Sequence, residues 1–434
     1  MSVPSRVSRR RFLGQGAATL AAGVALPYLI PSGLLAARPN DRIGVAGIGI
    51  GRQGSGVFLS AAGSTQARAV AVADTNLPRA EAMAAKLKVP AYQDYRKLLD
   101  RRDVDAITTA TPDHWRSLVS IHACQAGKDV YAEKPMTVTI SEGRRMVEAV
   151  RKYQRVFQTG SQQRSMLANR VGCELVRTGK IGKILKVIAH NYPSPWEGNL
   201  PAQPVPEGLD WDMWCGPTEP VPYNLDLCTP RAKPGWISFR PYSGGEMTGW
   251  GAHGLDQVQW ALGMDAAGPI EVWTEGEKFD PPTYTKPERR TRAEKICSQP
   301  KVFFRYPGGI VVELGKGPEG GAIFVGEKGT ITIDRGVCKS EPKELAEEAL
   351  AAAVKTSENH TENWLACIKS RQKPVADVEI GHRTATVCHL GNIARWAGRK
   401  LTWDPVKETF PGDPQANTYL DRPRRKPYLL PEKV

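Results

Sequence analysis

The chain has 434 residues, of which 41% are hydrophobic and 24% charged, a composition that supports a sizeable core and excludes a disordered or collagen-like protein. Lysine and arginine number 59 against 45 acidic residues, and the formal charge of +14 raises nucleic acids or acidic surfaces as partners. No apolar run reaches about 18 residues, so stable membrane insertion is not expected.

Residues 1–37 have the features of an export signal. Residues 8–13 form a twin-arginine pattern, and an apolar stretch over residues 17–30 follows, with no acidic residue before Arg38. A basic or disordered tail is the alternative. Removal of the segment takes four arginines with it and lowers the formal charge from +14 to +10. We expect an exported, periplasmic protein, and because the twin-arginine route carries folded proteins, a cofactor would be acquired before export and kept.

The eight cysteines are scattered, without a Cys-x-x-Cys pair or a spacing that suits zinc, so no metal site is expected. Most are expected to be buried thiols. An oxidising compartment would permit a disulfide, and Cys215 with Cys228 is the first pair to test, although the sequence does not assign it.

A glycine-rich turn opens an expected dinucleotide-binding domain over residues 38–160. An apolar strand at residues 43–48 is followed by Gly49-Ile50-Gly51-Arg52-Gln53-Gly54, at the start of a helix that is expected to continue through Leu59. Glycines at these positions allow a tight turn, the approach of a pyrophosphate to the backbone and close packing of the helix. A glycine-rich turn without a ligand has the same pattern, so further signals are needed.

A carboxylate after the next strand supports the dinucleotide interpretation. The strand at residues 68–73 ends in Asp74, 20 residues after Gly54. A carboxylate there accepts hydrogen bonds from the ribose hydroxyls and repels a 2′-phosphate, which favours NAD over NADP. The alternative is that Asp74 only caps the following helix.

The alternation of strands and helices continues and predicts a parallel, doubly wound sheet. The expected strands lie at residues 104–109, 129–132 and 156–159, and the expected helices at residues 113–126 and 141–153. Ligands bind beyond the carboxyl ends of such strands. Two groups fall there, Thr111-Pro112-Asp113-His114-Trp115 and Glu133-Lys134-Pro135. Lys134 can hydrogen-bond a substrate hydroxyl or assist proton transfer, or it is a surface lysine in a turn.

Residues 161–434 change character and predict an antiparallel or mixed sheet. We expect a helix over residues 162–177 and a strand over 183–191, followed by a long loop to residue 240. Later strands are expected at 302–305, 310–313, 322–325 and 330–333, and helices at 345–354, 359–369 and 381–396. The loop carries four tryptophans that can stack on sugar rings or pack on one another: Trp196, Trp211, Trp214 and Trp236.

The motifs together resemble those of the glucose-fructose oxidoreductase, inositol dehydrogenase and MocA family, over most of the chain after residue 40. They are Gly49-x-Gly51-x-x-Gly54, Asp74, and residues 110–115, 131–135, 178–183, 209–217, 249–256 and 377–383. The resemblance implies an α/β protein with a Rossmann domain followed by an α/β domain. The open, mainly antiparallel sheet of the second domain carries substrate on one face and often an oligomer contact on the other.

The resemblance also implies roles for individual residues. Lys134 and His253 are the expected catalytic pair, because a histidine in this motif accepts the proton of a substrate hydroxyl. The residues expected at NAD are Gly49, Gly51, Arg52, Gln53, Gly54, Asp74, Thr111, Pro112, His114, Trp115, Glu133, Lys134 and Gln162. The residues expected at the substrate are Gln163, Arg164, Trp211, Trp250 and Asp256. For Arg164, a solvent-exposed position at the start of a helix is the alternative.

The chain departs from the family pattern at Gly249. The family histidine commonly follows an aspartate by four residues, and here that position is Gly249, so Asp256 is an alternative partner for His253. The run His253-Gly254-Leu255 is partly similar to the NAD-dependent glycosidases of the α-N-acetylgalactosaminidase type. In those enzymes a tyrosine precedes the histidine by three residues, where this chain has Trp250.

The favoured hypothesis is an exported enzyme with tightly bound NAD that oxidises a sugar hydroxyl in a redox-neutral cycle, such as glycoside hydrolysis. A net sugar dehydrogenase or two-substrate oxidoreductase is the alternative, and a catalytically silent sugar-binding protein is the second. Nucleic-acid binding is not expected, because the basic residues are dispersed apart from residues 286–295 and 422–426. His360, His382 and His389 are expected in the core or on the surface, and a homo-oligomer is expected.

Overall fold

The computed structural model describes residues 42–229, 235–285, 297–354 and 359–431. The expected export signal and the basic run 286–295 lie outside these residues. Within the described residues, no helix is both long and apolar enough to cross a membrane. Residues 42–434 belong to one compact unit, and the description below concerns that unit.

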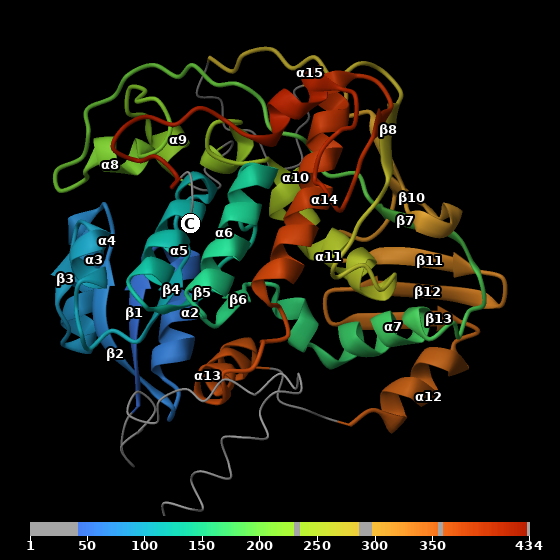
Figure 1. Ribbon diagram of the computed structural model, residues 1–434, viewed down its shortest axis with the longest axis horizontal. Helices are drawn as coiled ribbons and strands as arrows, with labels where there is room; N and C mark the ends of the chain where they lie inside the picture. Colours follow the sequence, from blue (N-terminus) through green and yellow to red (C-terminus); the bar gives the residue numbers. More distant parts are fainter. Residues whose placement is uncertain (1–41, 230–234, 286–296, 355–358, 432–434) are drawn as a thin grey trace, which may run out of the picture. The chain divides into compact units, whose positions relative to one another are not determined.

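The first domain is built on a six-stranded sheet with the order β3-β2-β1-β4-β5-β6 (Figure 1). Every neighbouring pair of its strands is parallel. The strands are β1 (Ile43–Ile48), β2 (Ala67–Ala73), β3 (Ala91–Tyr92), β4 (Ala106–Thr109), β5 (Asp129–Ala132) and β6 (Phe157–Thr159). All residues of β1, β4, β5 and β6 are buried, as expected for strands that helices cover on both faces. The predicted doubly wound sheet is confirmed.

Five helices alternate with these strands, and their ends are set by local capping. They are α2 (Arg52–Ala62), α3 (Leu77–Leu87), α4 (Tyr95–Leu99), α5 (Asp113–Gln125) and α6 (Ile140–Lys152). The side chain of Asn76 caps α3, that of Asp94 caps α4 and that of Thr139 caps α6. No side chain caps the N-terminus of α2 at Gly51 or that of α5 at Pro112.

The second domain is built on an eight-stranded mixed sheet with the order β13-β12-β11-β7-β10-β9-β8-β14. The pair β7–β10 is parallel and the other neighbours are antiparallel. The strands are β7 (Ile184–His190), β8 (Glu271–Glu275), β9 (Lys301–Arg305), β10 (Val311–Gly315), β11 (Ala322–Gly326), β12 (Gly329–Asp334), β13 (Val337–Glu341) and β14 (Leu401–Thr402). The sheet is therefore mainly antiparallel, as the resemblance implies.

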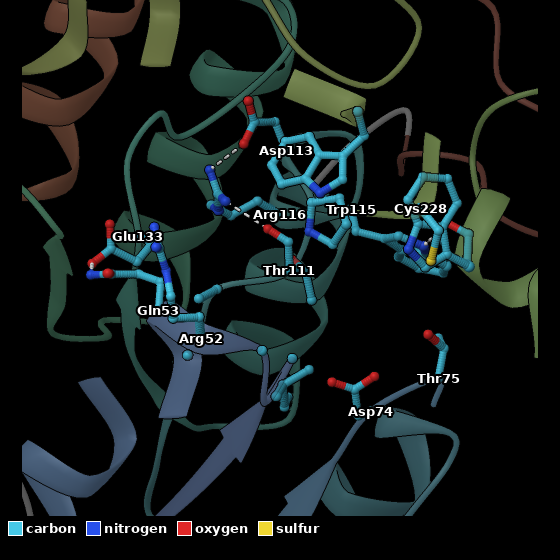
Figure 2. A pocket seen from close by; sticks show the side chains of 18 of the residues that line it. Arg52, Gln53, Asp74, Thr75, Thr111, Asp113, Trp115, Arg116, Glu133 and Cys228 are labelled. Atoms are coloured by element: carbon cyan, nitrogen blue, oxygen red, sulfur yellow. Dashed lines mark hydrogen bonds and ion pairs between the residues drawn. The ribbon is translucent and has the colours of Figure 1, made fainter. Parts of the chain in front are cut away.

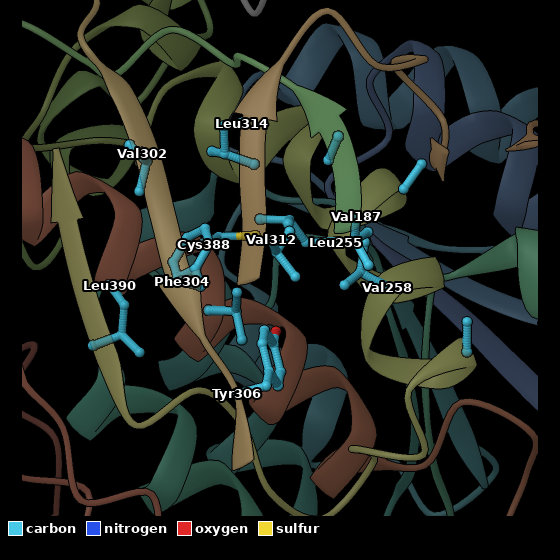
Figure 3. Close-up of a cluster of buried hydrophobic side chains, with 14 of the residues drawn as sticks. Val187, Leu255, Val258, Val302, Phe304, Tyr306, Val312, Leu314, Cys388 and Leu390 are labelled. Atoms are coloured by element: carbon cyan, nitrogen blue, oxygen red, sulfur yellow. The ribbon is translucent and has the colours of Figure 1, made fainter. Parts of the chain in front are cut away.

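The helices of the second domain pack on one face of this sheet. The main ones are α7 (Leu167–Arg177), α11 (Gly251–Ala261), α12 (Glu344–Ala352) and α14 (Val378–Ala397). Shorter helices are η2 (Gln162–Ser165), α8 (Trp211–Cys215), α9 (Leu225–Cys228), η3 (Trp236–Ser238), α10 (Glu246–Gly249), η4 (Pro307–Gly309), α15 (Pro414–Asn417) and η5 (Thr418–Leu420). In Figure 3, Leu255 and Val258 of α11 and Cys388 and Leu390 of α14 meet buried strand residues such as Phe304.

One predicted helix is interrupted. The sequence predicts a continuous helix over residues 162–177, but the backbone at Met166 is extended, with φ −81° and ψ 132°. The segment is therefore a short 3₁₀ helix, η2, followed by α7.

A helix from the far end of the chain completes the first domain. Helix α13 (His360–Ser370) places Trp364 and Leu365 in the same buried core as Val45 of β1. Hydrogen bonds from Ser60 to Thr361 and from Gln66 to Glu362, each 2.8 Å long, fix it beside α2.

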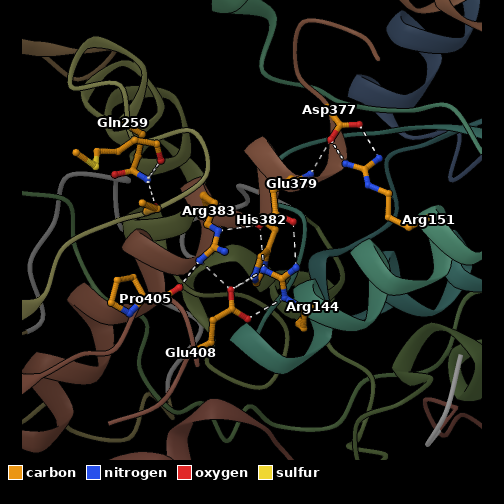
Figure 4. A network of polar contacts seen from close by, with 11 residues as sticks. Arg144, Arg151, Gln259, Asp377, Glu379, His382, Arg383, Pro405 and Glu408 are labelled. Carbon is orange, nitrogen blue, oxygen red and sulfur yellow. Dashed lines mark hydrogen bonds and ion pairs between the residues drawn. The ribbon is translucent and has the colours of Figure 1, made fainter. Parts of the chain in front are cut away.

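A charged network joins helix α6 of the first domain to helix α14 of the second (Figure 4). Arg144 of α6 donates to both Glu379 and Glu408, with its Nη2 3.0 Å and 2.7 Å from their Oε1 atoms. His382 and Arg383 of α14 bind the same Glu408. Because the partners come from both domains, the network fixes the two against each other.

The basic run at residues 422–426 binds the chain itself. Arg422 and Arg424 both donate to the fully buried carboxylate of Glu142, at 2.8 Å and 3.1 Å. Arg425 donates to the carbonyl oxygens of Gly216 and Thr218. Three arginines of this run therefore form hydrogen bonds within the folded chain.

All eight cysteines are free thiols in the structure. The Cys215–Cys228 disulfide, offered as the first pair to test, is therefore not formed. Burial raises the pKa of both thiols to about 11, which makes them unreactive at neutral pH.

Candidate functional site

A cavity of about 630 Å³ lies at the carboxyl ends of β1, β2, β4 and β5, where residues of the second domain close it. Its size is typical of a ligand pocket, and its position is the one at which doubly wound sheets bind ligands. Figure 2 shows it with Asp74 and Thr75 on one side and Glu133 and Gln53 on the other.

The glycine-rich turn leaves an open cradle at this cavity. Gly49 has φ +79°, which favours glycine, and a Cβ on Gly54 would lie 1.8 Å from the Gly49 carbonyl oxygen. A Cβ on Gly51, in contrast, meets no atom within 4 Å. The backbone at Gly51 is thus open to the cavity, at a helix N-terminus without a side-chain cap or an acidic residue in its first turn. This arrangement fits the pyrophosphate of a dinucleotide.

Asp74 is held in position for a ribose. Its Oδ2 accepts from the backbone N–H of Ile50 at 2.8 Å, and its Oδ1 accepts from that of Asn76 at 2.9 Å. The side chain that caps α3 is Asn76, so the role of Asp74 is not that of a helix cap. Arg79, which also lines the cavity, lies 3.4 Å from the carboxylate.

Glu133 forms the centre of a polar group at the other end. Its Oε1 accepts from Gln53 Nε2 at 2.8 Å and from Gln162 Nε2 at 2.7 Å, and all three residues line the cavity. A Cβ on Gly160 would lie 2.8 Å from Glu133 Cδ, so the glycine is needed to make room. The two amides and the packing hold a buried carboxylate in one orientation.

Lys134 and His253, the expected catalytic pair, line the same cavity although they come from different domains. Lys134 follows β5, and its Nζ donates to the carbonyl oxygen of Gly249 at 3.1 Å. His253 lies in the first turn of α11 and is 5% exposed. The ring of Trp250 lies edge-on to His253, with the centroids 5.4 Å apart. The fold thus places a cation, an imidazole and an aromatic ring around one space.

Family models match nearly all of the described chain. Residues 42–161 match the NAD-binding Rossmann fold of the Gfo/Idh/MocA oxidoreductase family, and residues 170–430 match the C-terminal alpha/beta domain of that family. The chain belongs to the Gfo/Idh/MocA oxidoreductase family. Its first domain is accordingly an NAD-binding Rossmann domain, and the open turn at Gly51 and the fixed Asp74 fit that cofactor.

The names of curated relatives describe reactions on sugars and polyols. Inositol 2-dehydrogenase of Salmonella paratyphi B is 30% identical over 149 residues, which cover 33% of this chain and 44% of that protein. The 2,7-anhydro-N-acetylneuraminate hydratase of Mediterraneibacter gnavus is 28% identical over 37% of this chain and 41% of its own. The chain thus spans less than half the length of these curated relatives.

The fold also matches solved structures. Aldose-aldose oxidoreductase from Caulobacter crescentus superposes with a TM-score of 0.58 at 16% identity, covering 83% of this chain and 100% of that one. At this identity the match shows the shared fold.

Most of the family residues expected at NAD line the cavity, but His114 does not. His114 is fully buried, and its Nε2 lies 2.8 Å from the carbonyl oxygen of Trp214. Burial lowers the pKa of His114 to about 3, so the ring is neutral. Trp115 lines the cavity, and its Nε1 donates to the carbonyl oxygen of Met213 at 2.8 Å. The rings of His114 and Trp115 thus both bind a segment of the second domain, residues 213–214.

Four of the five residues expected at the substrate lie away from the cavity, and Trp250 alone of that group lines it. Arg164 is buried, and its guanidinium pairs with Asp256 at 2.9 Å and with Asp265 at 2.7 Å. Asp256 also accepts from Thr384 at 2.9 Å, which makes it part of the interior of the domain. These two expected positions need correction, because the charges satisfy each other.

Gln163 and Trp211, the other two residues expected at the substrate, also make contacts within the fold. Gln163 donates to the carbonyl oxygen of Gly320 at 2.6 Å. Trp211 stacks on Trp214 with the centroids 4.5 Å apart and donates to Val221. The tryptophans of the loop therefore pack partly on one another, although Trp214 and Trp236 also reach the cavity wall.

Sequence reasoning did not assign a role to Asp113, which lines the cavity. Its carboxylate accepts from Arg116 Nη1 at 2.9 Å and from Ser243 Oγ at 2.6 Å (Figure 2). Burial raises the pKa of Asp113, while the charges of Arg116 and Lys134 act in the opposite direction. Asp113 stands within the Thr111–Trp115 motif, so its place in the motif was the available signal.

Further lining residues were not among those expected at NAD or at the substrate. Among them are Arg335, at the turn between β12 and β13, and Met213, Trp214, Tyr223, Leu225 and Cys228 of the long loop. The histidines of the C-terminal helices, His360, His382 and His389, are buried as expected. Among the described residues, no group of three metal-ligating side chains occurs.

Proposed function

We propose that this protein is an exported enzyme that uses tightly bound NAD to oxidise a sugar hydroxyl in a redox-neutral cycle, such as glycoside hydrolysis by oxidation, elimination, hydration and reduction. The observation that carries the proposal is that Lys134 and His253 share one cavity with the open turn at Gly51 and with Asp74. Groups for proton transfer thus share a pocket with the groups that fit a dinucleotide.

Different residues of the chain bind the cofactor and handle the proton of the substrate. Gly51 and the N-terminus of α2 hold the pyrophosphate, and Asp74 holds the adenosine ribose. When bound, NAD would supply an acceptor for the hydride of the carbon that bears the oxidised hydroxyl. His253 takes the proton of that hydroxyl. Lys134, oriented by the Gly249 carbonyl, donates a hydrogen bond to the same oxygen and stabilises its developing charge.

We infer redox neutrality from the expected export, and the names of two similar proteins describe redox-neutral reactions. An exported protein has no free pool of NAD, so the hydride must return to a substrate before the next turnover. The relative from Mediterraneibacter gnavus is named a hydratase, and addition of water involves no net oxidation. A two-substrate sugar oxidoreductase also meets this condition, and the name of the Caulobacter crescentus neighbour describes such a reaction.

The proposal is tested on the purified full chain. Denaturation should release NAD or NADH, and aryl glycosides supplied without cofactor should release their aglycone in the wild type. That activity should be lost in Lys134→Ala and His253→Ala. NADH accumulation with free sugars and no aglycone release would favour a dehydrogenase. Bound cofactor without turnover of any sugar would favour the silent sugar-binding protein, which the glycine at position 249 makes a candidate.

We also propose a homo-oligomer formed through the strand face of the second domain. Trp273 of β8 stacks there on Phe303 of β9 with the centroids 5.4 Å apart, and both alternate along their strands with buried residues. Light scattering during size-exclusion chromatography tests this, and a monomer at micromolar concentration would contradict it.

A further inference from the structure

The long loop of the second domain forms one wall of the cavity. Met213, Tyr223, Leu225 and Cys228 of this loop line the cavity together with Asp74 and Arg79 of the first domain. Figure 2 shows Cys228 facing the same space as Thr75 and Asp74. In Figure 1, α8 and α9 lie over the end of the first domain that holds α3, β3 and α4.

Backbone hydrogen bonds attach the start of this loop beside Asp74. The N–H of Leu77 donates to the Gly208 carbonyl oxygen and that of Asp210 donates to the Thr75 carbonyl oxygen, each at 2.9 Å. Gln93 Nε2 donates to both of these carbonyl oxygens at 3.1 Å. The loop is therefore fixed to the residues that follow Asp74.

Gly208 allows this attachment. Its φ is +76°, and a Cβ there would lie 2.6 Å from Pro78 Cδ. A side chain at this position would therefore be strained and would push the loop away from the start of α3.

A second attachment lies on the far side of the cavity. The indole of Trp115 donates to the Met213 carbonyl oxygen, and His114 binds the carbonyl oxygen of Trp214. Gly216 packs on the ring of Trp115, because a Cβ there would lie 2.2 Å from the ring atom Cε2. The stretch from Gly208 to Gly216 is thus held at two places, and the loop continues from it to Tyr223 and Leu225, which line the cavity.

The part of the loop that follows these attachments offers an apolar side chain to the cavity. Leu225 is 54% exposed although it lines the cavity, and Tyr223 beside it is buried. Leu225 belongs to α9, whose start is capped by the side chain of Asn224, so its position is set by the backbone. An exposed leucine in the same cavity as a carboxylate that fits a ribose suits the flat, apolar face of an adenine base.

We propose that residues 206–228 complete an adenosine subsite and retain the dinucleotide in its cavity. Leu225 covers the adenine, and the attachments at Gly208 and Met213 keep the cover closed. The proposal rests on the proposed function only in taking NAD as the ligand. It assigns retention to the second domain, whereas the glycine-rich turn and Asp74 of the first domain provide recognition.

The experiment compares two probes on the full chain after removal of endogenous cofactor. The probes are NADH and reduced nicotinamide mononucleotide, which lacks the adenosine half. Leu225→Ala should raise the Kd for NADH by about tenfold, because it uncovers apolar surface of the base. The Kd for the mononucleotide should stay unchanged. Gln93→Ala should speed the release of bound NADH by a similar factor, because it frees the loop.

Matched variants outside the cavity serve as controls. Leu429→Ala removes a comparably exposed leucine, and Gln66→Ala removes a glutamine hydrogen bond elsewhere in the first domain. Both should bind and release NADH as the wild type does. The proposal is overturned if Leu225→Ala retains NADH as well as Leu429→Ala does, or if it weakens both probes equally. Because the readout is binding, absence of sugar turnover leaves this test intact, and its failure leaves the proposed chemistry standing.

Discussion

The Nζ of Lys134 donates a hydrogen bond to the carbonyl oxygen of Gly249 across 3.1 Å, and this contact joins the first domain to the second. Lys134 follows strand β5, and Gly249 ends helix α10. The family commonly has an aspartate at position 249, and here a main-chain oxygen meets the lysine. An acceptor in the backbone is present whatever side chain the position carries, so the orientation of Lys134 does not depend on that aspartate.

Replacing Lys134 by methionine should abolish most turnover while leaving the fold intact. The change removes the charge that polarises the substrate oxygen, and we expect kcat to fall by about 10²- to 10⁴-fold. Single-turnover kinetics with a glycoside substrate measure the effect. Lys128→Met is the matched control, since Lys128 also donates to a carbonyl oxygen, that of Arg101, but does not line the cavity. Equal losses in both variants would contradict the role of Lys134.

Alanine at two glycines of the turn should affect two different properties, the stability of the fold and the NAD content. Gly54→Ala places a Cβ 1.8 Å from the Gly49 carbonyl oxygen and should destabilise the first domain. Gly51→Ala meets no protein atom within 4 Å, so the melting temperature should stay near that of the wild type while NAD content falls. Calorimetry and cofactor analysis of the purified variants separate the two effects. Full NAD occupancy in a folded Gly51→Ala variant would exclude a pyrophosphate beside this residue.

Asp74→Ser should relax the discrimination between NADH and NADPH. The change removes the carboxylate that repels a 2′-phosphate and frees Arg79, now 3.4 Å from it, to bind that phosphate. We expect the ratio of the two Kd values to shift towards NADPH by about tenfold or more. Fluorescence titration of the cofactor-free protein measures both values. Asp103→Ser, which removes an ion pair with Arg101 outside the cavity, should leave the ratio unchanged.

Glu142 should make the protein sensitive to acid. Burial alone raises the pKa of Glu142, but Arg422 and Arg424 outweigh it and bring the pKa to about 2, below the ordinary 4.5. As the pH falls, the carboxylate of Glu142 therefore takes up a proton in the unfolded chain before it does so in the folded protein. The stabilisation is therefore complete above about pH 5 and is lost as the pH falls towards 2, and it amounts to about 3 kcal/mol at neutral pH.

Glu142→Gln should consequently be less stable than the wild type at pH 7, and the difference should shrink by pH 3. Denaturant titrations at both pH values measure it. Glu148→Gln is the control on the same helix, because its pair with Arg145 is solvent-exposed and contributes little. A constant difference between the wild type and Glu142→Gln across this range would refute the assignment.

Strands β1, β4, β5 and β6 of the first sheet were predictable because they are apolar runs whose residues are all buried, whereas the half-buried β3 was not expected. A helix after Asp74 was expected, but the bounds of α3 were not, since its buried face consists of Ala80 and Ala84, which are too small to produce a clear apolar pattern. Strand β13 was missed for a related reason. Its buried positions are Cys338 and Ser340, and they alternate with an exposed valine, Val337, so the hydrophobic pattern points the wrong way.

Site residues that stand in motifs could also be predicted, whereas those positioned by tertiary contacts could not. Lys134, His253 and Asp74 stand in motifs whose spacing places them at the ends of strands and helices, and they reach the cavity. Arg164 was also expected at the substrate, but the direction of its side chain is set by an ion pair with Asp265. This partner is distant in the sequence, and no local pattern indicates it. Leu225 belongs to an irregular loop, where neither periodicity nor motif indicates which side chains face a ligand.

The packing of α13 makes the two domains inseparable in folding, although they follow each other along the chain. Trp364 and Leu365 are fully buried in the core that contains Val45, so a fragment ending near residue 160 would leave that core open to water. We therefore expect the core of the first domain to be completed only after residues 360–370 have been synthesised. Heating should therefore unfold the whole molecule in a single transition, and proteolysis between the domains should release no stable NAD-binding fragment.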